Sequence, residues 1–280
     1  MRSLRLLIPA IALLFLSGCF QIIDVMRINP DGSGTVEQSV LISKKFIGQM
    51  NEMMGGFSGY SSAKAEPPEL FDPAMLREQA STMGEGVVYQ SGKKVETADF
   101  TGFTAVYAFS DINSLKLDQL NLNQQIPVTG APAGDGQPAR MLSFHFTKGS
   151  PATLIIEQPV ASKPAAAPPG PDGPATAAPV PQGAASDEEA AKLAKMFMGM
   201  KVLLAIDING SIVSTNATYR DGNRLTLLEL DMEKLGNSFS RMEKLTGIKT
   251  GSLGEAKELL KEIPGVRMDA NDKLTVVFDK

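Results

Sequence analysis

Side chains suited to nucleophilic or acid–base chemistry near neutral pH are scarce in this chain. It has one cysteine, Cys19, and one histidine, His145, among 280 residues. A serine or cysteine nucleophile assisted by histidine would have to use His145 as its base. His145 alternates with Phe144 and Phe146, so a strand here would place it on the face opposite these aromatic rings. We therefore expect His145 to be a surface residue and not a catalytic base.

Other recognisable chemistry is also missing from the sequence. One histidine excludes a multi-histidine zinc site, and no glycine-rich phosphate loop or dinucleotide fingerprint is present. Asp31 and Gly32 lack the further oxygen ligands of a calcium loop, so a plain turn is expected there. Two acids distant in sequence could still meet as a hydrolytic pair, a hypothesis that stays open although no pair is marked. We predict no enzymatic activity, no catalytic residues, no cofactor and no metal.

The N-terminus has the pattern of a signal peptide. Arg2 and Arg5 precede an uncharged, mainly apolar run at residues 6–16, which Ser17 and Gly18 follow. A transmembrane helix needs about 20 apolar residues. This shorter run therefore predicts a cleaved signal and not a lasting membrane span.

The run Leu16-Ser17-Gly18-Cys19 resembles the lipobox of bacterial lipoproteins. The resemblance implies cleavage between Gly18 and Cys19, a diacylglyceryl group on the Cys19 thiol, and a fatty acid such as palmitate on the new N-terminus. The alternative is an ordinary secretory signal with Cys19 as a free thiol. An aspartate directly after the lipobox cysteine would resemble an inner-membrane retention signal, but this chain has Phe20 there. The position therefore favours the periplasmic leaflet of the outer membrane if the source is Gram-negative.

Composition limits the fold and the partners of the mature chain. Loss of 18 residues from 280 leaves 262, enough for one or two domains. Without Arg2 and Arg5 the 27 basic residues fall to 25 against 31 acidic ones, a net charge near −6. This sign argues against nucleic acid or anionic headgroups as main partners. A single cysteine also excludes an intramolecular disulfide.

Alternating apolar residues and turn signals predict several strands. A hairpin is expected to join residues 22–28 and 35–42, and further strands are expected within residues 86–109 and 141–158. Asn209-Gly210 is a strong hairpin signal, which predicts that 202–208 and 211–219 pair with each other and that 225–230 completes a meander. Residues 266–268 and 274–278 are expected to be the closing strands.

Amphipathic helices are predicted between these strands. Asp72-Pro73 is a helix start and Gly84 a stop, while helical spacing or capping boxes mark 44–54, 186–200, 231–245 and 252–264. Residues 160–185 are rich in proline, alanine and glycine, which predicts a disordered linker. We expect an α+β fold of antiparallel β-meanders packed against these helices. Its parts are 19–159 and 186–280, as one domain or two.

Methionines cluster on two of the predicted helices. Met50, Met53 and Met54 share a face, whereas Met198 points away from Met196 and Met200. Core packing is the simplest role, an apolar groove or membrane-facing patch is the second, and a cuprous ion site is the third.

The run 206–217, continued by Asp221-Gly222 and Leu225-Thr226-Leu227, resembles the closing hairpins of the LppM-type bacterial lipoprotein domain. This chain has Asn209 where a proline is usual and lacks the tryptophan after the last turn. The resemblance implies an α+β envelope domain and carries no catalytic residues across. The function expected is a membrane-anchored, non-enzymatic lipoprotein that binds an apolar or lipid ligand or a protein partner. The alternative is a structural or assembly accessory of an envelope complex.

Overall fold

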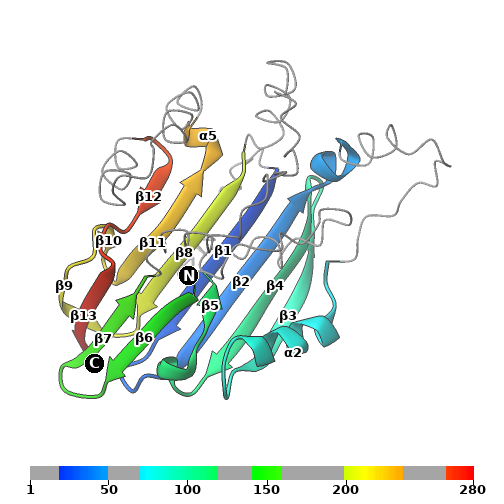
Figure 1. The fold of residues 1–280 in the computed structure, drawn as a ribbon. Helices are drawn as coiled ribbons and strands as arrows, with labels where there is room; N and C mark the ends of the chain where they lie inside the picture. Colours follow the sequence, from blue (N-terminus) through cyan, green and yellow to red (C-terminus); the bar gives the residue numbers. More distant parts are fainter. Residues whose placement is uncertain (1–18, 50–69, 119–140, 159–198, 236–262) are drawn as a thin grey trace, which may run out of the picture.

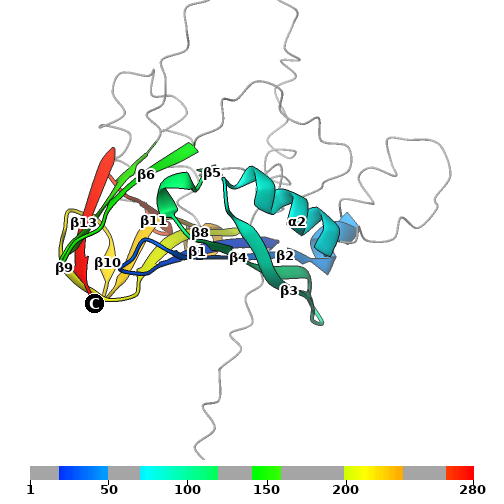
Figure 2. The ribbon, with the colours of Figure 1, turned by 90° about the horizontal axis from the view of Figure 1, so that it is seen from below.

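The structure, a computed structural model, describes residues 19–49, 70–118, 141–158, 199–235 and 263–280. These residues form a large and a small β-sheet, and the small sheet lies over one face of the large one (Figures 1 and 2). The large sheet has the order β10-β11-β8-β1-β2-β4-β3, with β12 also paired to β11, and the small sheet has the order β5-β6-β7-β13-β9.

The strand boundaries follow the alternation of apolar and polar residues. The strands of the large sheet are β1 (Phe20–Ile28), β2 (Gly34–Ser43), β3 (Val88–Glu96), β4 (Phe100–Phe109), β8 (Lys201–Ile208), β10 (Arg220–Asp221), β11 (Arg224–Asp231) and β12 (Val266–Met268). Those of the small sheet are β5 (Leu117–Asp118), β6 (Met141–Thr147), β7 (Ala152–Glu157), β9 (Ser211–Thr215) and β13 (Lys273–Asp279).

The predicted α+β fold is wrong, because the described residues are mainly strands. Their helices are short: α2 (Pro73–Thr82), the 3-10 turn η1 (Ile112–Ser114), α5 (Met232–Leu235) and a helical segment at residues 44–49. The prediction assumed that helices would cover the apolar face of the strands. That face is instead covered largely by the second sheet, so the architecture is two stacked sheets. No helix in the described part of the chain has the length and apolar character needed to span a bilayer.

One hydrophobic core joins the two sheets. In β1 and β2 the alternate residues Ile22, Met26, Val36 and Val40 point into it. The small sheet supplies fully buried side chains from two paired strands: Leu154 and Ile156 of β7, and Leu274, Val276 and Phe278 of β13. Burial of each such side chain contributes roughly 1.5–3 kcal/mol, which makes this interface the main source of stability.

Helix α2 covers the part of the large sheet that the small sheet leaves open (Figure 2). The predicted start is confirmed, because the Asp72 carboxylate accepts the Ala74 N–H at 2.7 Å with Pro73 at the first helical position. Leu76 and Ala80 are buried beneath the helix. Gly84, at φ 136, follows the helix in a backbone conformation that other residues rarely adopt.

Both sheets contain strands from each side of the predicted linker. Strand β1 pairs in parallel with β8, from Gln21 opposite Lys201 to Ile28 opposite Ile208. In the small sheet β7 pairs with β13. Residues 160–185, the predicted linker, lie outside the described residues. The described residues before and after this segment therefore contribute to one core.

The predicted hairpin at Asn209-Gly210 is wrong. Strand β8 belongs to the large sheet, while β9, which follows this dipeptide, pairs with β13 in the small sheet. Asn209 is held by the turn after β1, since its N–H donates to Ile28 O at 2.8 Å and its side-chain amide donates to Asn29 Oδ1 at 2.8 Å. A Cβ at Gly210 would collide with Asp279 O of β13, so the glycine permits a close crossing between sheets.

A second crossing, from β12 to β13, is closed by a buried carboxylate. Asp269 is fully buried, and its oxygens accept the Thr218 N–H at 2.7 Å, the Asn271 N–H at 2.9 Å and the Asn271 side-chain amide at 2.8 Å. Asn216 accepts the Thr275 N–H at 2.7 Å beside it. This network ties the segment after β9 to the segment before β13, and it satisfies backbone groups at the corner.

The remaining sequence predictions have mixed outcomes. The hairpin between β1 and β2 is confirmed. Strands within 86–109 and 141–158 are confirmed as β3, β4, β6 and β7, and 266–268 and 274–278 as β12 and β13. The strand at 225–230 is confirmed as β11, which pairs with β8, β10 and β12 but not with β9, the strand directly after Gly210. The predicted helices at 186–200, beyond 235 and at 252–264 fall almost wholly outside the described residues.

Asp269→Asn is expected to lower the free energy of unfolding by about 2 kcal/mol, because an amide group cannot accept all three hydrogen bonds and hydrogen bonds to charged groups contribute about 1.5–3 kcal/mol each. Urea unfolding would measure the change. Glu85→Gln, at an exposed carboxylate, serves as the control. Equal stability of the two variants would contradict the assigned role of Asp269.

Candidate functional site

Cys19, the residue predicted to carry lipid, lies directly before β1. Its carbonyl oxygen accepts the Ser43 N–H at 2.7 Å, which extends the β1–β2 pairing by one residue. The next residue, Phe20, is 5% exposed and contacts the Phe46 ring edge-on, with 6.3 Å between centroids. The predicted modification site is therefore continuous with the sheet.

The Cys19 thiol is half-buried and packs against the core. Burial raises the pKa of the thiol above its ordinary value, and the nearby Lys45 ammonium acts in the opposite direction with a smaller effect. A raised pKa keeps the sulfur protonated at neutral pH, whereas catalytic cysteines have lowered values. The free thiol is thus poorly suited to nucleophilic catalysis.

Several element ends lie at the same edge of the large sheet as Cys19 (upper edge in Figure 1). Because β8 is parallel to β1, both strands begin here, while the antiparallel strand β2 ends here. We define the anchor edge as Cys19, Ser43, Lys44, Lys45, Asp99 and Lys201. Lys44 Nζ donates to Thr97 O at 2.8 Å and lies 3.2 Å from a Glu96 oxygen.

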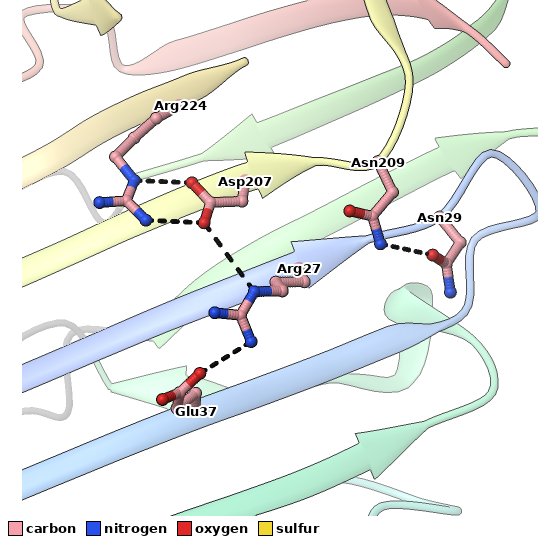
Figure 3. Close-up of polar contacts among 6 residues, drawn as sticks. All are labelled: Arg27, Asn29, Glu37, Asp207, Asn209 and Arg224. Atoms are coloured by element: carbon pink, nitrogen blue, oxygen red, sulfur yellow. Dashed lines mark hydrogen bonds and ion pairs between the residues drawn. The ribbon is translucent and has the colours of Figure 1, made fainter. Parts of the chain in front are cut away.

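A ladder of alternating charges crosses four neighbouring strands on the face of the large sheet that points away from the core (Figure 3). Arg224 donates to both oxygens of Asp207 at 2.7 Å. Arg27 Nη1 lies 2.7 Å from Glu37 Oε2, and its Nε lies 4.0 Å from Asp207. The bond to Asp207 raises the pKa of Arg224. The ladder is charge-balanced, so it favours the observed strand register and is not suited to binding an ion.

A buried polar cluster lies between α2 and the large sheet. The Tyr107 hydroxyl donates to Gln79 Oε1 at 3.0 Å, and Gln79 Nε2 donates to Gln38 Oε1 at 3.3 Å. Burial raises the pKa of Tyr107, and the negative charge of Asp24 adds to the rise. The phenol therefore stays protonated at neutral pH and acts as a hydrogen-bond donor.

The structure does not bring the sequence-predicted residues together. His145 is exposed on β6, with Nε2 3.8 Å from Glu157 Oε2, and lies in a different sheet from the strand that follows Cys19. The Asp31 carboxylate accepts hydrogen bonds from Ser33 within the first turn, as a plain turn requires. Gly18 lies outside the described residues.

Most of the methionines considered from sequence lie outside the described residues: Met50, Met53, Met54, Met196 and Met198. Met200 is partly buried and packs against apolar side chains of the core, as expected for the simplest role. Among the described residues no three His, Cys, Asp or Glu side chains are grouped so as to hold a metal.

Sequence reasoning missed both the charge ladder and the buried polar cluster. Arg27 and Glu37 lie on two strands whose antiparallel pairing was predicted, so their cross-strand approach was accessible from sequence. Asp207 and Arg224 join them only through the parallel β1–β8 pairing, for which no local pattern exists.

Tyr107→Phe is expected to lower the free energy of unfolding by about 1 kcal/mol at neutral pH, because it removes the hydrogen bond to Gln79. The folded-state pKa of Tyr107 lies above the ordinary value of 10.0. Its contribution is therefore fully present below pH 10 and is lost as the pH rises through the folded-state pKa. Urea unfolding between neutral and alkaline pH should show a shallower alkaline decline for the variant.

Gln79→Leu is the control for Tyr107, because it removes the same hydrogen bond but keeps the titrating phenol. It should lose stability at neutral pH and keep the alkaline decline. Identical alkaline slopes for Tyr107→Phe and the unmodified protein would contradict the raised pKa.

The Asp207–Arg224 pair is expected to have a coupling energy of about 1 kcal/mol or less, because exposed ion pairs are weakened by water and salt. A double-mutant cycle of Asp207→Ala and Arg224→Ala, followed by urea unfolding, measures this energy. It should decrease further at high salt. A coupling of several kcal/mol would show that the ladder stabilises the fold far more than surface pairs do.

Comparisons with known proteins find few similarities. No protein-family model matches the chain, and no curated protein matches it. Among solved structures, the chain is similar to the folded domain of LppM from Mycobacterium tuberculosis, determined by NMR, with 12% sequence identity and a TM-score of 0.33. The match covers 96% of this chain and 95% of that one. A likeness at this TM-score supports no statement about the fold or the function of this chain.

Proposed function

We propose that this chain is a lipoprotein of the bacterial cell envelope that acts by binding and not by catalysis. In this proposal the chain is cleaved between Gly18 and Cys19, and Cys19 carries a diacylglyceryl group on its thiol and a fatty acid on its amino group. In a Gram-negative source the protein would face the periplasm from the outer membrane.

One observation carries the proposal: the first strand begins one residue after the predicted cleavage site. Phe20 is already buried and Cys19 already accepts a hydrogen bond from Ser43. Processing at Gly18 would therefore leave the strand intact and the modified residue at the edge of the folded body. The signal pattern that ends in Leu16-Ser17-Gly18-Cys19 resembles the lipobox of lipid-anchored bacterial proteins.

Binding is favoured over catalysis by the state of the described polar groups. Before modification the Cys19 thiol has a raised pKa, as does the phenol of Tyr107, so both are protonated at neutral pH. The carboxylates of Asp207 and Glu37 are matched by arginines within the ladder. None of these arrangements resembles an activated nucleophile or an acid–base pair.

The face of the large sheet that points away from the core supports a binding role. Its central strands present half-buried apolar side chains, Ile23, Leu41 and Leu203, beside the charged ladder. At the sheet edge Val88 is 56% exposed. A surface of this mixed kind is suited to an apolar or lipid ligand, or to a protein partner in the envelope.

Lipidation is tested by growing bacteria that express the full chain with an alkyne analogue of palmitate. We expect the label in the membrane fraction, and a mass spectrum of the N-terminal peptide should begin at Cys19 with three acyl chains. Cys19→Ser should abolish labelling and leave residues 1–18 attached, because no thiol remains to be modified.

Ser17→Ala is the matched control, since it keeps a small residue before the cleavage site and should leave labelling unchanged. An unlabelled full-length chain with a free thiol in the soluble fraction would overturn the proposal.

A further inference from the structure

We propose that the anchor edge of the large sheet rests on anionic phospholipid headgroups, so that the strands point away from the membrane and the opposite edge is held clear of it. This inference rests on the proposed lipidation of Cys19 and adds an orientation and a lipid contact to it.

The first argument is the lack of a tether between the lipid and the sheet. The Cys19 carbonyl is bonded to Ser43, and Phe20 is buried against Ile42 and Phe46. Acyl chains attached to Cys19 can enter the bilayer only if the anchor edge lies within the reach of one side chain. A chain with a long linker would leave the folded body free to turn, whereas this geometry does not.

The second argument is the charge around Cys19. Lys44 and Lys45 are exposed in the helical segment after β2, and Lys45 is close enough to act electrostatically on the Cys19 thiol. Lys44 is paired with Glu96, but Lys45 forms no ion pair with the carboxylates of the described residues. A basic side chain near the membrane surface is attracted to anionic lipids. Lys45 is therefore placed to contact a headgroup phosphate next to the acyl chains.

The opposite edge of the sheet has a different character. The turn after β1 is bonded to η1, since Ile112 N–H donates to Gly32 O at 2.9 Å. Exposed side chains of both charges lie there, with Asp31, Glu85 and Asp111 beside Lys116 and Lys148. The charge of this edge is therefore mixed, and the orientation rests on the attachment at Cys19 and on Lys45 beside it.

Strand β4 supplies a matched pair of reporter positions. Asp99 precedes the strand at the anchor edge, where Phe100 pairs with Ser43, and Ser110 follows it at the opposite edge, where Phe109 pairs with Gly34. Both positions are exposed. At about 3.3 Å per residue they lie roughly 35 Å apart along the strand.

The experiment uses full chains carrying Asp99→Cys or Ser110→Cys, purified from membranes after processing. Acylation blocks Cys19, so a thiol-reactive fluorophore labels only the introduced cysteine. Each protein is reconstituted into phosphatidylcholine vesicles containing phosphatidylglycerol, with and without lipids that carry a headgroup quencher. We expect loss of most emission at position 99 and none at position 110.

Each outcome decides one question. If the mass spectrum shows no acyl chains, the proposed function fails before the vesicle measurement. If acylated protein is quenched equally at both positions, or at neither, the inference of an upright sheet on the headgroups is wrong and the proposed function still stands.

Lys45→Glu tests the lipid contact separately. In vesicles with phosphatidylglycerol it should reduce quenching at position 99, and in pure phosphatidylcholine it should not. Lys93→Glu, on the exposed edge strand β3, is the control and should leave quenching unchanged in both. An equal effect of both variants would show that Lys45 does not contact the headgroups.

Discussion

The parallel pairing of β1 with β8 is the interaction on which the rest of the structure depends. These strands lie at the centre of the large sheet, and all the remaining strands of that sheet are added outward from them, through β2 on one side and β11 on the other. Parallel neighbours require a long connection, and here the connection contains β2 to β7. The pairing therefore fuses residues before and after the predicted linker into one core. It also places the starts of both strands at one edge, beside Cys19.

Alternation along these strands separates the properties of the two faces. Even-numbered residues of β1 such as Ile22 and Met26 point into the core, whereas Arg27 points to the other side and joins the charge ladder. Asp24 follows the same alternation but is charged, and it lies on the core-facing side beside Tyr107 and Gln38. The consequence is a body with an apolar interior, a polar cluster beneath α2 and a mixed outer face. Lipid attached to Cys19 would lie at the edge of the large sheet where these layers end.

Local features were predictable where neighbouring residues decide them. The turn after β1, the Asp72 cap of α2 and the alternation of Phe103, Ala105 and Tyr107 all follow from sequence spacing. Asn209-Gly210 shows the limit of such reasoning. Its turn propensity is real, but a turn does not specify which strand its flanking residues will join. Asn209 is held by Ile28 and Asn29, and β9 pairs with β13 in the small sheet, where Ile212 is buried.

The sequence by itself determined the scarcity of reactive side chains, the signal pattern ending at Cys19 and most strand positions, because these depend on residue identity and local periodicity. Only the tertiary structure decided the pairing of strands, the division into two sheets, the Asp269 network and the completed ladder. The physical reason is that backbone hydrogen bonds are nearly the same for every residue type. Partners such as Gln21 and Lys201 are selected by packing of the whole core, and nothing near either residue encodes the other.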